Sequence, residues 1–112
     1  MYFQLSSLPD PMGSKMAKRQ FELLAETFHM LADFSRVQIV WLLSQGEHSV
    51  GDIAKRLSMS QPAVSHHLRM LRNLRLVRVR REGRTSFYSL VDLHIEKMLQ
   101  ERFRHIDDGI KE

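Results

Sequence analysis

The sequence from position 49 to position 72 reads SVGDIAKRLSMSQPAVSHHLRMLR and contains the starts of two short helices. Ser49 and Ser60 each stand where a hydroxyl can accept the free N–H groups of a first helical turn. Pro62 fits the first turn of the second helix, because a proline there loses no hydrogen bond. Apolar side chains recur at helical spacing in both segments. Two short helices joined by a tight turn predict a helix-turn-helix.

The second helix of this motif is predicted to lie in the major groove of DNA. Its outward positions carry hydrogen-bonding and cationic side chains, as contacts to bases and phosphates require. These positions are Gln61, Ser65, His66, Arg69 and Arg72. We expect His67 to pack behind His66, because adjacent residues of a helix diverge by about 100°.

The segment after this helix changes from helical to alternating periodicity. Between positions 76 and 90, apolar residues alternate with arginines and other polar residues, which predicts a two-stranded hairpin. The tip of the hairpin, Arg81-Glu82-Gly83-Arg84, projects cations from a compact turn. Such a wing can reach phosphates or the minor groove beside a reading helix.

Helical patterns flank this unit on both sides. Residues 18–32 predict one helix, and a second is predicted to begin at a capping box of Ser35 with Gln38 and to stop at Gly46. A last amphipathic helix is predicted from Asp92 toward Asp108. The order of elements predicts a mainly α fold with a β-hairpin wing, a winged helix-turn-helix. We expect it to be homodimeric through its N- and C-terminal helices.

We predict that residues 17–110 form one DNA-binding and dimerisation domain. Residues 1–16 are expected to be a disordered N-terminal segment, in which Tyr2-Phe3-Gln4 resembles the remnant of an expression tag. A chain of 112 residues with 43% hydrophobic residues suits a single domain and excludes a large multi-domain enzyme. No catalytic pair or phosphate-binding loop is apparent, so we do not expect an enzyme.

Charge and cysteine content restrict the chemistry further. The net charge is +4, and seven arginines but one glutamate lie between His66 and Arg84, as in a nucleic-acid footprint; a merely solvated arginine face is the alternative. The sequence has no cysteine, so any metal must bind to His, Asp or Glu. No apolar run is long enough to cross a membrane, and we expect a soluble cytoplasmic protein.

Four residues of the last predicted helix could bind a metal: Asp92, His94, His105 and Asp108. His94 and His105 share a helix face but lie roughly 16 Å apart along the axis, so they cannot bind one ion within one chain. If a second copy packs antiparallel, the start of one helix faces the end of the other, and two sites with nitrogen and oxygen ligands form. Such sites suit zinc or cobalt. The alternative is that Asp92 is a simple helix cap and both histidines are interface residues.

Taken together, the motifs resemble the ArsR/SmtB family of metal-responsive repressors. The resemblance covers about residues 21–108 and rests on Val50 to Ala54, Ser60 to Leu68, Leu74 to Val77, Arg81 to Arg84 and Tyr88 to Leu90. It implies that the hairpin is a wing and that Ser60, Gln61, Ser65, His66 and Arg69 read operator DNA. Our predicted set of DNA contacts also includes Ala63, Arg72, Arg81 and Arg84.

The resemblance also implies a metal effector. The family's zinc sensors use an Asp-x-His pair at the start of the last helix and a His followed three residues later by Glu or His from the other subunit. Asp92, His94, His105 and Asp108 match this pattern, although Asp108 is one methylene shorter than Glu and water could take its place. Other members bind metal through a cysteine where this chain has Ser49, so we do not expect sensing of arsenite, cadmium or lead there.

We therefore expect a homodimeric repressor that binds an inverted repeat in operator DNA and is released by zinc, or by cobalt or nickel. Two alternatives stay open: a repressor of the same family with a non-metal inducer, and a small metal-buffering protein whose basic segment is incidental. We expect neither a membrane nor a small-molecule substrate among its partners.

Overall fold

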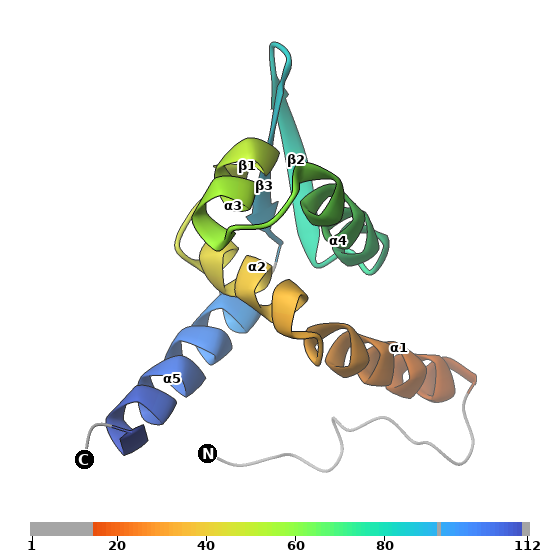
Figure 1. Cartoon of the computed structure of the whole chain (residues 1–112). Coiled ribbons are helices and arrows are strands. Elements are labelled where there is room, and N and C mark those ends of the chain that lie inside the picture. The colour runs from red at the N-terminus through yellow and green to blue at the C-terminus, as the bar shows by residue number, and fades with distance from the viewer. Residues whose placement is uncertain (1–14, 92, 111–112) are drawn as a thin grey trace.

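The computed structural model describes residues 15–91 and 93–110, with side chains described for residues 17–91 and 93–106. This part of the chain forms five helices and three strands, arranged as in Figure 1. In order they are α1 (Lys15–Leu31), α2 (Phe34–Ser44), β1 (His48–Ser49), α3 (Val50–Leu57), α4 (Gln61–Asn73), β2 (Val77–Glu82), β3 (Thr85–Leu90) and α5 (Leu93–Ile110). The predicted winged helix-turn-helix is confirmed.

Helix α2 lies at the centre of the hydrophobic core. Its apolar residues from Ile39 to Leu43, with Trp41 partly buried, pack against buried side chains of α3, α4 and β2. Ile53, Val64 and Leu68 are completely buried there. Burial of a side chain of this size contributes about 1.5–3 kcal/mol. The core therefore fixes the two helices of the helix-turn-helix to α2.

The turn of the helix-turn-helix is closed by hydrogen bonds at both ends. At the end of α3, the N–H of Ser58 donates to Lys55 O and the N–H of Met59 donates to Ala54 O, while Ser58 adopts the left-handed conformation with φ of +54°. This is a Schellman motif. Helix α4 then begins at once, because the Ser60 hydroxyl accepts the N–H of Ala63. The predicted caps of both helices, Ser49 and Ser60, are confirmed.

The sheet has three strands in the order β1-β3-β2, all antiparallel, whereas the sequence predicted a two-stranded hairpin. Strand β1 pairs His48 with Tyr88 and Ser49 with Phe87. Its two residues are too few to produce a readable alternation. The hairpin turn falls at Gly83, whose φ of +62° suits glycine and a tight two-residue connection.

Two further predictions about helix starts were wrong. Asp33, not Ser35, caps α2: its side chain accepts the N–H of Arg36. Asp33 lies two positions earlier and is an equally good capping residue. The prediction favoured Ser35 because Ser35 and Gln38 have the spacing of a capping box. Lys15 and Met16 belong to α1 rather than to a disordered segment, while the rest of that predicted segment lies outside the described residues.

Helices α1 and α5 extend away from the core in different directions (Figure 1). Their surfaces keep several large apolar side chains exposed, among them Phe21, Leu24 and Phe28 on α1 and Met98, Phe103 and Ile106 on α5. Exposed apolar residues in this number are typical of a protein contact surface. Among the described residues, no helix is long and apolar enough to span a bilayer.

The left-handed conformation of Ser58 leads to a stability prediction. An L-residue in this conformation costs about 1–2 kcal/mol, a cost that glycine avoids. We expect Ser58→Gly to raise the free energy of unfolding by about 0.5–1 kcal/mol, measured by urea unfolding at fixed protein concentration. Ser58→Ala keeps the Cβ atom and serves as the control, with a change below about 0.5 kcal/mol. A Ser58→Gly variant less stable than Ser58→Ala would contradict this account.

Candidate DNA-binding surface and metal ligands

Helix α4 presents a polar face to solvent. Gln61, His66, Arg69 and Arg72 are exposed on it, and Ser65 is half-buried. Ser60, at the start of the helix, is exposed, but its hydroxyl already accepts the N–H of Ala63, itself half-buried. The opposite face, with Val64, Leu68 and Leu71, is buried in the core. The orientation therefore leaves the predicted reading residues on the side of α4 away from the core.

The hairpin projects beyond α3 and α4 (Figure 1). Arg81 and Arg84 lie exposed at its tip, and within residues 15–91 and 93–110 neither of them forms an ion pair. Exposed cations at a hairpin tip can contact DNA phosphates. Such contacts fix the register of a protein on DNA without reading its sequence. The hairpin thus has the position and charge of a wing.

Arg80 differs from these two arginines because carboxylates already surround it. Its Nε and Nη2 donate to the Glu47 carboxylate at 3.1 and 2.8 Å, and its Nη1 donates to Glu82 Oε2 at 2.7 Å. The hydrogen bonds from Arg80 lower the pKa of Glu47, and those to Glu47 and Glu82 raise the pKa of Arg80. The arginine count of the sequence therefore overstates the charge available to DNA.

His67 packs behind the exposed face of α4, as predicted. Its Nδ1 is buried and has no hydrogen-bond partner within the described part of the chain. The centroid of its ring lies 5.8 Å from that of the His66 ring. Desolvation lowers the pKa of His67; the carboxylate of Asp33 opposes this, and the charges of Arg36 and His66 add to it. Desolvation therefore favours the neutral form of His67, close to Asp33 and Arg36 at the start of α2.

Helix α5 carries the described part of the predicted metal site. His94 and His105 are both exposed on it, and His105 Nε2 lies 3.0 Å from Glu101 Oε1. The hydrogen bond with His105 is the main cause that lowers the pKa of Glu101, with the charge of Arg104 next. An ionised carboxylate only accepts hydrogen bonds, so His105 Nε2 donates to Glu101. Nδ1 is then the ring nitrogen that can bind a metal ion.

The remaining two predicted ligands lie outside the described side chains: Asp92 is not described, and Asp108 is described only in its backbone. Among the described residues, no three His, Asp or Glu side chains come together as a metal site. The two exposed imidazoles on one helix fit the nitrogen ligands that zinc, cobalt and nickel accept.

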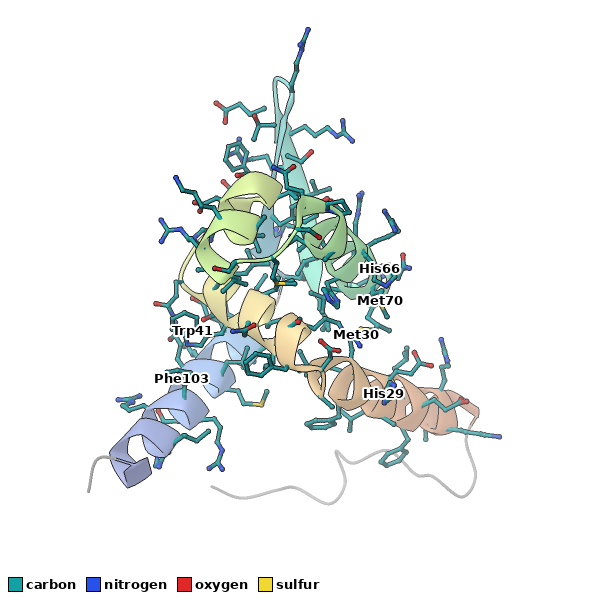
Figure 2. The ribbon with its side chains drawn as sticks, viewed as in Figure 1. His29, Met30, Trp41, His66, Met70 and Phe103 are labelled. Atoms are coloured by element: carbon teal, nitrogen blue, oxygen red, sulfur yellow. The ribbon has the colours of Figure 1, made fainter. Side chains whose placement is uncertain are left out.

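Helix α5 is attached to the core through α2. Trp41 and Phe103 lie close together (Figure 2), with their ring centroids 5.2 Å apart and their planes tilted by 33°. Gln100 Nε2 donates to Ser44 O at 3.1 Å. An apolar groove of about 480 Å³ lies beside these residues and extends to Phe34 and Ile106. The C-terminal helix thus contacts the same helix that holds the helix-turn-helix.

Comparison with known proteins connects this geometry to a family. Residues 33–79 match the family described as "Bacterial regulatory protein, arsR family". The chain is 43% identical over 91 residues to the HTH-type transcriptional regulator KmtR of Mycobacterium tuberculosis, across 81% of this chain and 67% of that protein. The chain belongs to the ArsR family. Members of this family are DNA-binding transcriptional regulators and not enzymes, as the sequence predicted.

Two further relatives extend the comparison of this ArsR-family protein. It is 38% identical over 91 residues to the cadmium resistance transcriptional regulatory protein CadC homolog of Staphylococcus aureus, across 80% of this chain and 75% of that protein. A solved homodimeric winged helix-turn-helix DNA-binding domain from Mycobacterium bovis, described as a possible ArsR-family regulator, superposes with a TM-score of 0.78. That match has 26% identity and covers 91% of this chain and 94% of the other.

Sequence reasoning missed the pairing of Glu47 with Arg80 and the contact of Glu101 with His105. The second had a signal, because residues four apart on a helix are neighbours. The first had none, since 33 positions separate the two partners.

The buried Nδ1 of His67 predicts a pH dependence of stability. Because the folded state lowers the pKa of His67 below its ordinary 6.5, the folded protein binds fewer protons there than the unfolded chain. The stabilisation that comes from burying a neutral His67 is fully present above the ordinary pKa and is lost as the pH falls below it. We expect the free energy of unfolding to fall between about pH 7 and pH 5, and to fall less in His67→Leu. His66→Leu is the exposed control, and an equal reduction of the pH dependence in both variants would exclude His67 as its source.

Proposed function

We propose that this ArsR-family protein is a homodimeric repressor that binds an inverted repeat in operator DNA and releases it on binding zinc, or cobalt or nickel, between its C-terminal helices. The observation that carries the DNA-binding half is the exposed polar face of α4 beside a hairpin whose tip holds two exposed arginines. Such a regulator works in the cytoplasm, where bacterial operator DNA lies.

Base reading is assigned to the exposed face of α4. Gln61 can bond two edge atoms of adenine, and Arg69 can do the same with guanine. Ser65, His66 and Arg72 extend this surface, with Ser60 and Ala63 at its start. Arg81 and Arg84 would contact phosphates from the wing. One reading helix contacts one half-site, so an inverted repeat requires a second protomer. The two reading helices then lie about 34–36 Å apart.

Dimerisation is assigned to α1 and α5. Both helices expose large apolar side chains that a monomer leaves in water, including Phe28 at 61% and Phe103 at 54% exposure. The solved relative from Mycobacterium bovis is described as homodimeric. Covering these faces with a second copy would remove them from solvent and would also bring two α5 helices together.

The metal site is assigned to Asp92 and His94 of one protomer with His105 and Asp108 of the partner subunit. The exposed imidazoles of His94 and His105 support this assignment. A relative named for cadmium resistance supports a metal effector but not its location. Zinc bound there would link the two protomers. Zinc weakens DNA binding only if it prefers a dimer arrangement in which the reading helices no longer match successive grooves.

The α4 assignment predicts two different kinds of DNA defect. We expect Gln61→Ala to cost about 1–3 kcal/mol on the operator duplex and little on random DNA, because it removes a base contact. Arg84→Ala should weaken binding to both duplexes and lower the salt dependence by about one unit, because it removes a phosphate contact. Fluorescence anisotropy on DNA from upstream of its own gene measures both. Arg19→Ala on α1 is the control, and equal loss of operator binding in that variant would argue against the assigned surface.

The metal assignment predicts a variant that binds DNA but does not respond to zinc. We expect zinc to weaken operator binding of the unaltered dimer tenfold or more, about 1.4 kcal/mol of coupling, and a chelator to reverse it. His94→Ala should keep its DNA affinity and lose this response. His29→Ala, an exposed histidine outside the ligand set, should keep it.

Two results would contradict the metal assignment. A His94→Ala dimer released by zinc as readily as the unaltered protein would remove His94 from the site. Specific DNA binding that ignores zinc altogether would point to a different inducer while leaving the DNA assignment intact.

A further inference from the structure

We propose that the ion pair between Glu47 and Arg80 is a clamp that positions the wing for DNA binding. Arg80 is then a positioning residue and not a phosphate contact, although it lies in the most basic stretch of the chain. The proposal rests on the proposed contact of the wing with DNA. It concerns the unmodified dimer and does not involve the metal.

The clamp joins two parts of the fold that are remote in sequence. Arg80 lies on β2, in the hairpin, while Glu47 directly precedes β1 and stands two residues before Ser49, the cap of α3. The pair therefore ties the wing to the start of the helix-turn-helix. The backbone pairing of β1 with β3 also connects these two parts, but it covers only two residues of each strand.

The geometry holds the guanidinium of Arg80 from several sides. Glu47 accepts two of its N–H groups, Glu82 accepts a third, and its Cζ lies 4.8 Å from the centre of the Phe87 ring. A two-point contact of this kind fixes orientation as well as distance, which a lysine cannot do. The side chains of Arg80 and Glu47 are 50% and 35% exposed, so the clamp contributes little to overall stability.

The two carboxylates have different roles in this arrangement. Glu82 belongs to the same strand as Arg80, so its contact does not connect the hairpin to anything else. Glu47 supplies the connection. Both are acidic groups on or beside a surface that faces DNA, so by charge alone the loss of either should strengthen DNA binding. A clamp predicts the opposite sign for Glu47.

The experiment compares Glu47→Gln with Glu82→Gln by anisotropy on a random-sequence duplex and on the duplex from upstream of its own gene. We expect Glu47→Gln to weaken both affinities about three- to tenfold, comparable to losing one or two wing contacts. Glu82→Gln should leave them unchanged or tighter. If Glu47→Gln binds as tightly as the unaltered protein, or more tightly, the clamp is wrong.

Arg80→Lys provides the second test, because it keeps the positive charge and removes the two-point contact. We expect it to weaken binding as Glu47→Gln does; unaltered affinity would show that charge alone matters and would overturn the proposal. In the free protein, the backbone ¹⁵N heteronuclear NOE of residues 81–85 should fall in Glu47→Gln and not in Glu82→Gln. Unchanged NOE values in both variants would also overturn it. Circular dichroism verifies that each variant is folded.

The double variant Arg81→Ala/Arg84→Ala separates failure of the clamp from failure of the proposed function. Weakened binding in this variant, with normal binding in Glu47→Gln, rejects the clamp alone. Unaltered binding in the double variant rejects the wing as a DNA contact and the clamp with it, while the assignment of α4 is tested separately by Gln61→Ala.

Discussion

The burial of α2 is the constraint on which the rest of the structure depends. Ile39 and Val40 are almost fully buried, and this one helix contacts the helix-turn-helix, the sheet and both terminal helices. A core built around a single helix transmits a displacement of that helix to every element packed on it. The polar face of α4 and the histidines of α5 are therefore attached to a common support, although they lie on different sides of it.

Local signals in the sequence predicted most of the fold. Ser49 and Ser60 were recognisable as caps because capping depends on residues within one turn. The hairpin was recognisable from the alternation of its two strands. Strand β1 was not predictable, since it has two residues and exists only through pairing with β3. The start of α2 was predicted wrongly because two nearby residues, Asp33 and Ser35, are both good caps. The helix uses Asp33.

The candidate site was predictable to the extent that it lies on one helix. The exposed face of α4 follows from helical periodicity, and so does the position of His94 and His105 on α5. The state of individual charges does not follow from periodicity. Arg80 is neutralised by Glu47 across 33 positions, while Arg81, its immediate neighbour, stays exposed at the tip. Which arginines are available to DNA is decided by tertiary contacts.

The turn between α3 and α4 has a consequence for the thermodynamics of recognition. Because the Schellman motif at Ser58 and the cap at Ser60 follow each other directly, no freely rotating residue separates the two helices. A recognition element joined by a flexible linker would lose conformational entropy when it became ordered on its target. Here that ordering takes place when the protein folds, so more of the contact energy at the DNA remains as affinity.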